Sequence, residues 1–117
     1  PKFFPVDGAP SARLITAVTR HDGSAAAMQL SAAVLAACWR EERDIALDAT
    51  LAELLQECDL PAARLAQSRG ADIQAHYDAH TQAAIDAGVF GAPTWVVDGE
   101  MFWGQDRLEF VARKLGL

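Results

Sequence analysis

Apolar residues recur every three or four positions through most of the first 88 residues, the spacing that places side chains on one face of a helix. Glycine, proline and small polar residues interrupt this pattern and mark where helices begin and end. We predict helices over residues 11–22, 24–43, 48–58, 61–70 and 72–88, after an extended segment that contains Pro5 and Pro10. The greater part of the chain is therefore expected to be helical.

The second of these helices has the longest apolar face. Ser24 is its expected N-cap, because a serine side chain can accept a hydrogen bond from a free N–H group of the first turn. The polar run of residues 40–43 is expected to end it. The residues predicted to face inward are Met28, Leu30, Val34, Leu35, Cys38 and Trp39. Asp48 is expected to open the third helix, and Pro61 to lie in the first turn of the fourth.

Beyond residue 88 the pattern takes the period of strands. Thr94–Val97 is β-branched and aromatic, Asp98-Gly99 is a strong hairpin-turn signal, and Met101–Trp103 is the expected returning strand. Asp106 is expected to start a last helix. That helix would turn Leu108, Phe110, Val111 and Leu115 inward. The chain is thus predicted to be of the α+β class, mostly helical, ending in a ββα unit.

The two strands are apolar on both faces, which is typical of inner strands in a covered sheet. No other strand is predicted, and a two-stranded hairpin is marginally stable alone. We expect the remaining strands to be missing from these residues or to come from another chain. The first ten residues, PKFFPVDGAP, begin without methionine and resemble the interior of a longer chain.

Charge and composition narrow the possible partners. The chain has 117 residues and a net charge of −6 at pH 7, which argues against binding to nucleic acid or to an anionic membrane surface. The longest apolar run, Ala25–Trp39, is too short to span a bilayer.

Cys38 and Cys58 do not form a Cys-x-x-Cys motif, and we expect two buried free thiols rather than a disulfide or metal pair. No secretory signal is seen, which favours the cytoplasm.

Two short segments could carry binding chemistry. Ala92-Pro93 immediately precedes a strand, and a cis bond there would leave the Ala92 N–H and C=O free to pair with an extended peptide. A plain trans turn is the alternative. After the second strand, Gly104 to Arg107 would form a helix N-terminus, which favours a carboxylate. Asp106 could cap that helix or bind an ammonium group, and Arg107 could lie in solvent or make a charge-assisted contact.

His76 and His80 are spaced four residues apart on one helix, as metal ligands often are. No third ligand accompanies them, so a polar helix flank is the better interpretation and no metal is expected. Phosphate-binding loops and nucleophile elbows are not found. The residues therefore provide candidate binding groups and no evident nucleophile.

The stretch GVFGAPTWVVDGEMFWGQDR, residues 88–107, resembles the C-terminal signature of the 2-hydroxychromene-2-carboxylate isomerase family. That family is related to kappa-class glutathione transferases within the DsbA-like thioredoxin-fold group. The FFP near the start, Trp39 with ERDI at residues 42–45, and the approach from Thr81 to Gly88 are also similar. The similarity extends over essentially the whole chain. It implies a helical insertion domain over residues 1–88 and the C-terminal part of a thioredoxin-like fold over 89–117, without the N-terminal βαβ segment.

The resemblance also implies a function, a cofactor and a set of site residues. It implies a glutathione-dependent isomerase of aromatic catabolism, with Pro93 as a cis proline and the Ala92 backbone paired with the cysteinyl unit of glutathione. Gln105, Asp106 and Arg107 would hold the γ-glutamyl end. The apolar wall for a small aromatic substrate could include Phe90, Phe102 and Trp103, although each ring could equally be core, since burial contributes about 1.5–3 kcal/mol.

The catalytic residue of the family, a serine or a cysteine near the end of the first strand, is expected upstream of Pro1. None of Ser11, Ser24, Ser31 and Ser68 matches its context. The alternatives are a DsbA-like thiol-disulfide oxidoreductase, a kappa-type transferase, and a non-catalytic helical interaction module or inactive fragment. The open apolar edge of the first strand predicts a homodimer formed through an intermolecular sheet or helix packing.

Overall fold

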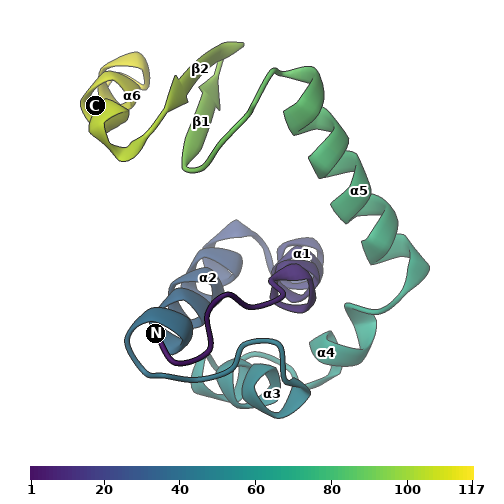
Figure 1. The fold of residues 1–117 in the computed structure, drawn as a ribbon. Coiled ribbons are helices and arrows are strands. Elements are labelled where there is room, and N and C mark those ends of the chain that lie inside the picture. Colours follow the sequence, from purple (N-terminus) through teal and green to yellow (C-terminus); the bar gives the residue numbers. More distant parts are fainter. The chain divides into compact units, whose positions relative to one another are not determined.

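A computed structural model describes all residues from Pro1 to Leu117 (Figure 1). It contains five helices, then a hairpin, then a short helical end. The elements in order are α1 (Ala9–Asp22), α2 (Ser24–Trp39), α3 (Asp48–Glu57), α4 (Ala63–Gln67), α5 (Ala71–Asp86), β1 (Thr94–Val97), β2 (Glu100–Trp103), the 3₁₀ turn η1 (Gln105–Arg107) and α6 (Leu108–Lys114). The predicted order and type of elements are confirmed, and so is the mostly helical α+β class.

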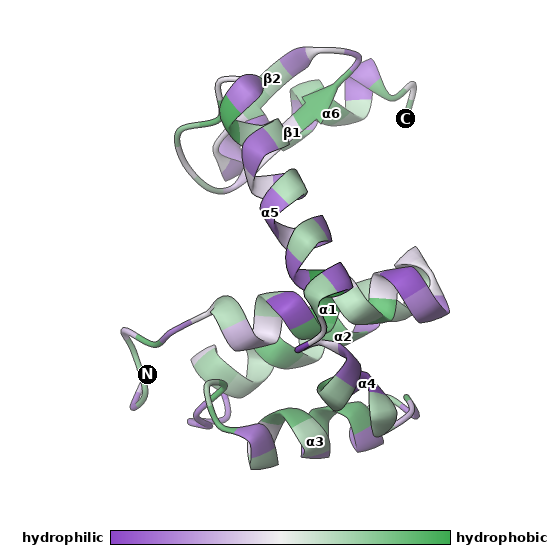
Figure 2. Ribbon diagram, turned by 90° about the vertical axis from the view of Figure 1, so that its right-hand side faces the viewer, coloured by the Kyte–Doolittle hydropathy of each residue, from purple (hydrophilic) through white to green (hydrophobic).

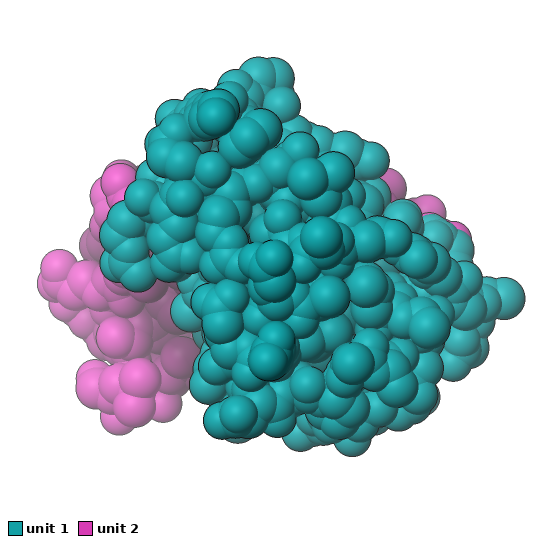
Figure 3. Space-filling model, turned by 90° about the horizontal axis from the view of Figure 1, so that it is seen from below, with its two compact units in different colours: residues 1–77 teal, residues 78–117 magenta.

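The chain forms two compact units, residues 1–77 and residues 78–117, shown in separate colours in Figure 3. We call them the helical unit and the hairpin unit. The division falls within α5, in which hydrophilic and hydrophobic residues alternate along the helix (Figure 2). The resemblance implies a different boundary, at residue 88, between an inserted helical domain and a thioredoxin-like portion. That boundary stays a prediction.

The helical unit has a closed apolar core. α1 packs on α2 and α4, and α3 packs on α2 and α4. The large side chains of this core that are almost fully buried are Leu14, Val18, Leu30, Leu51, Leu54 and Leu55. Cys38 and Cys58 lie in the same core as free thiols, as the sequence predicts. Because burying a leucine contributes about 1.5–3 kcal/mol, this cluster is the main source of stability in the unit.

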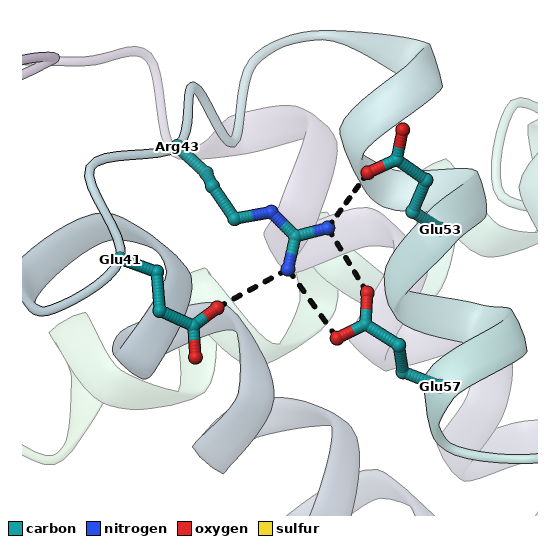
Figure 4. A network of polar contacts seen from close by, with 4 residues as sticks. All are labelled: Glu41, Arg43, Glu53 and Glu57. Carbon is teal, nitrogen blue, oxygen red and sulfur yellow. Dashed lines mark hydrogen bonds and ion pairs between the residues drawn. The ribbon is translucent and has the colours of Figure 1, made fainter.

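Ion pairs tie the connecting segments of the helical unit to its helices. Arg43, in the loop after α2, reaches Glu53 at 2.9 Å and Glu57 at 3.0 Å on α3, and Glu41 at 3.1 Å in its own loop (Figure 4). The hydrogen bond with Glu57, and then those with Glu41 and Glu53, raise the pKa of the Arg43 guanidinium. The loop is thereby fastened to α3.

Part of the prediction for α2 is wrong. Leu30, Val34 and Cys38 are buried, but Met28, Leu35 and Trp39 are 70%, 60% and 53% exposed. The last three lie on a stripe of the helix that α1 and α3 do not cover, because those helices pack on the opposite side. Trp39 instead packs against the exposed Phe4, with ring centroids 4.7 Å apart and ring planes tilted by 41°.

The ends of several helices also differ from the predictions. Ser24 is the first residue of α2 rather than its cap, since Gly23 occupies the cap position and no side chain caps the helix. α2 ends at Trp39 because Arg40 to Arg43 form the loop that carries the ion pairs. α1 begins at Ala9, with Pro10 in its first turn, and α4 begins at Ala63, after Pro61.

The hairpin unit contains the two-stranded antiparallel sheet. The turn residues Asp98 and Gly99 have φ angles of 51° and 79°, the left-handed conformation that a two-residue hairpin turn requires and that Asp-Gly favours. The predicted hairpin is confirmed, with β2 starting one residue earlier, at Glu100.

The last helix differs from its prediction in start and in burial. α6 begins at Leu108, after the turn η1, rather than at Asp106. Of the four residues expected to face inward, Val111 is buried, whereas Leu108, Phe110 and Leu115 are 51%, 42% and 55% exposed. A sheet of two short strands offers little surface against which a helix can pack.

Among the helices of this chain, none combines the length and the apolar character that crossing a membrane requires.

Candidate functional site

The register of the hairpin brings the two candidate segments together. Thr94, the first residue of β1, pairs with Trp103, the last residue of β2. The loop that precedes β1 and the turn that follows β2 therefore lie at the same end of the sheet. The backbone N–H of Gly104 donates a hydrogen bond of 2.8 Å to the C=O of Pro93, which joins them directly. Residues eleven positions apart thus form one local structure.

The first segment presents free backbone groups. The Ala92–Pro93 peptide bond is cis, as predicted. Ala92 is exposed, and its N–H and C=O take no part in the hydrogen bonds that hold the hairpin and its flanking turns. The hydroxyl of Thr94 donates to the C=O of Gly91, which fixes the chain on the N-terminal side of Ala92. Ala92 can therefore offer one donor and one acceptor to an extended peptide.

The second segment is a turn of exposed polar residues. Gln105, Asp106 and Arg107 form the turn η1, which is closed by a hydrogen bond from the N–H of Arg107 to the C=O of Gly104. Neither η1 nor α6 has a side-chain cap, so the capping role considered for Asp106 is not found. Because α6 is only seven residues long, we assign no carboxylate site to its N-terminus. The Asp106 carboxylate is exposed and available to a cation.

An open cavity of about 420 Å³ lies in the hairpin unit, along β2 and beside Arg107 of the turn η1. Three of the predicted site residues line it, namely Phe102, Trp103 and Arg107. Glu100, Met101 and Phe110 complete the lining. Phe90 does not line the cavity, but its ring lies 5.2 Å from that of Trp103.

The sequence prediction did not include Phe110 among the site residues. Its ring has the guanidinium groups of Arg107 and Arg113 at 5.5 Å and 5.6 Å, a geometry of cation–π contact. The signal was present, because Phe110 follows Arg107 by three residues and precedes Arg113 by three, so that the three share a helical face. It was instead assigned to the core face of the last helix.

The serines and cysteines of the helical unit are not arranged for nucleophilic chemistry. The hydroxyls of Ser11, Ser31 and Ser68 donate to backbone carbonyls of their own helical segments. Burial, with Glu57 and Asp59 nearby, raises the pKa of the Cys58 thiol, which keeps it protonated and unreactive at neutral pH. These groups are structural.

The histidines do not gather further ligands. His76 is half-buried and His80 is exposed on α5. No group of three His, Cys, Asp or Glu side chains in the described chain is placed to hold a metal ion. The candidate site is therefore the end of the hairpin that carries Ala92, Pro93 and the turn η1.

Part of the chain is similar in sequence to curated enzymes that share one name. A 2-hydroxychromene-2-carboxylate isomerase of Pseudomonas putida is 48% identical over 40 residues, which cover 34% of this chain and 20% of that protein. The isomerase of the same name from Sphingobium xenophagum is 47% identical over 38 residues, 32% of this chain and 20% of the relative. The matched segment thus spans about a fifth of the length of these curated relatives.

A family comparison covers far more of the chain. The sequence model of the family described as "DSBA-like thioredoxin domain" matches residues 3–116. This range includes most of the helical unit, the hairpin and α6, so the match extends well beyond the hairpin motif. The chain belongs to the DsbA-like thioredoxin domain family.

Proposed function

We propose that this chain carries the glutathione-binding part of an isomerase of the 2-hydroxychromene-2-carboxylate type, which acts in the breakdown of aromatic compounds. The names of the similar isomerases and the family membership support an enzyme of this group. The observation that carries the glutathione proposal is local. The exposed Ala92 backbone and the exposed Asp106 carboxylate lie on segments joined by the Gly104–Pro93 hydrogen bond.

The groups at this end of the hairpin fit the chemistry of a γ-glutamyl tripeptide. The N–H and C=O of Ala92 can pair with the backbone of the cysteinyl unit, in the manner of an added β-strand. Asp106 can accept charge-assisted hydrogen bonds from the α-ammonium group, and the Gln105 amide and the Arg107 guanidinium can bind the adjoining carboxylate. The site thus holds both ends of the γ-glutamyl-cysteine unit.

Glutathione held by the Ala92 backbone and Asp106 would supply a thiol that can add reversibly to a conjugated substrate and so permit its isomerisation. The residues of this chain bind and orient; we assign none of them the role of catalytic residue. The cavity beside the site, about 420 Å³, is of the size that takes a small ligand. Its walls, Phe102 and Trp103, with Phe90 against the latter, offer apolar faces to a planar aromatic substrate.

A titration with glutathione, followed by calorimetry, tests the proposal. Asp106→Asn removes the charge and keeps the size of the side chain, so we expect affinity to fall by about tenfold or more, the range for a lost charge-assisted hydrogen bond. Asp98→Asn is the matched control, because Asp98 lies in the turn at the other end of the hairpin and asparagine tolerates its positive φ. Equal affinity in all three proteins, or no binding by any, refutes the proposal.

One alternative enzyme has an observation in its favour. The family description names DsbA, so a thiol-disulfide oxidoreductase is the second candidate. Cys38 and Cys58 do not supply the redox pair, because both are buried free thiols on separate elements. Catalysed exchange between glutathione and a peptide disulfide would favour this candidate over the isomerase.

We also propose a cytoplasmic homodimer. The two free cysteines support the cytoplasmic location, and the exposed apolar residues of the hairpin unit support the homodimer. The strand β1 pairs with β2 along one edge, and its other edge is available to a second copy. A variant of β1 that tests the dimer is described in the Discussion.

A further inference from the structure

Trp103 lies directly against the backbone of Gly91. A Cβ atom added to Gly91 would stand 2.7 Å from Nε1 of the Trp103 indole, and 3.4 Å and 3.5 Å from Cε2 and Cδ1. The first separation is too short for any real contact, so the indole occupies the space that a side chain at position 91 would need. A side chain at position 91 would therefore force the Trp103 indole to move from this place.

This contact lies between the two halves of the candidate site. Gly91 immediately precedes Ala92-Pro93, while Trp103 immediately precedes Gly104, whose N–H donates to the C=O of Pro93. The ring of Phe90 packs on the same indole, tilted by 49°. One side chain thus connects the loop before β1 to the residue from which the turn η1 begins.

The arrangement contributes little as core packing. Trp103 is 51% exposed and Phe90 is 69% exposed, so neither ring withdraws most of its surface from water. The Trp103 ring therefore adds little to the stability of the fold. Its main effect is to fix the position of the Gly91 backbone beside it.

We propose that Trp103, packed on Gly91, is a positioning residue that sets the separation between the Ala92 backbone and the Gln105–Asp106 turn. The proposal rests on the proposed function in naming the ligand, a γ-glutamyl thiol peptide that must reach both halves at once. The packing itself is independent of the ligand. A displaced indole would move the loop, alter the Gly104–Pro93 hydrogen bond, and separate the two groups of contacts.

Gly91→Ala tests this directly, because the added methyl must displace the indole while both rings are free to move into solvent. In amide NMR spectra of the ¹⁵N-labelled 117-residue chain, we expect large shifts of the Trp103 indole N–H and of the Gly104 amide. Glutathione affinity should fall by about tenfold, since two sets of contacts are misaligned. The melting temperature should stay close to that of the parent protein.

Two further variants make the result specific. Gly8→Ala is the control, because Gly8 has a φ of −85° and no atom within 4 Å of an added Cβ, and we expect no change at Gly104 or in affinity. Gly91→Ala combined with Trp103→Phe gives the methyl room beside a smaller ring. We expect this pair to recover most of the affinity and of the Gly104 amide shift that Gly91→Ala alone removes.

The outcomes separate the two proposals. An unchanged Gly104 amide in Gly91→Ala, or no recovery in the double variant, overturns the positioning role even if the parent protein binds glutathione. A shifted Gly104 amide that the double variant restores, in a parent protein that does not bind glutathione, supports the positioning role and overturns the proposed function.

Discussion

The two units of this protein differ in how they treat their apolar residues. The helical unit buries leucines from three helices in one cluster, and its exposed apolar residues are confined to the outer stripe of α2 and a few loop positions. In the hairpin unit, Val111 is the one residue buried to this degree, and Phe90, Val96, Trp103 and Phe110 stay substantially exposed. Stability is therefore concentrated in one unit, and surface available for binding in the other.

The largest effect should come from the core of the helical unit. Leu54 is 1% exposed, so Leu54→Ala should lower the free energy of unfolding by about 2–5 kcal/mol, through lost apolar contact and a cavity. Leu108→Ala, at a residue that is 51% exposed in α6, should change it by about 0.5 kcal/mol or less. Urea denaturation followed by circular dichroism measures both. Equal losses of unfolding free energy in the two variants would contradict the concentration of stability in the helical unit.

A smaller effect should appear on acidification, again in the helical unit. The Nε and Nη2 groups of Arg64 donate to both carboxylate oxygens of Asp22 at 2.8 Å and 2.9 Å, joining α4 to the end of α1. This hydrogen bonding, with the charge of Arg64, holds the pKa of Asp22 below its ordinary value of 3.8. A lowered folded-state pKa adds stability that is present above the ordinary pKa and is lost as the pH falls through the folded one.

We therefore expect the free energy of unfolding to decline as the pH falls below about 4, and the decline to be shallower in Asp22→Asn. Arg64→Gln should flatten the same acid limb, because it removes the cause of the shift, and the double variant should add nothing further. Denaturant titrations at a series of pH values measure these slopes. An acid limb as steep in both variants as in the parent protein contradicts the assignment.

The smallest effect on stability should come from the strand edge of the hairpin unit. Val96 is 46% exposed in β1, and a lysine there should leave folding nearly unchanged while opposing strand pairing between copies. Sedimentation velocity should show a dimer for the parent protein and a monomer for Val96→Lys. Arg113→Lys, in α6, is a control of unchanged charge. A parent protein that stays monomeric at high concentration disproves the homodimer.

The comparison also explains which predictions succeeded. The hairpin was predictable because Asp98-Gly99 adopts its turn for local reasons, and the pairing of the two flanking strands follows from that turn. The closeness of the two site segments follows from the same turn. A two-residue turn at Asp98-Gly99 sets the register in which Thr94 pairs with Trp103, at the far end of the hairpin. The errors lie where burial depends on a partner. Met28, Leu35 and Phe110 are as apolar as buried residues, and their own sequence does not reveal which neighbour covers them.

The sequence by itself determined the order of the elements, the hairpin turn and the buried cysteines. Local chemistry is sufficient for these, because helical period and turn residues act over a few positions. Only the tertiary structure decided that Trp103 rests on Gly91 and that one stripe of α2 stays open. Those features depend on distances between residues remote in sequence, which packing sets and periodicity does not.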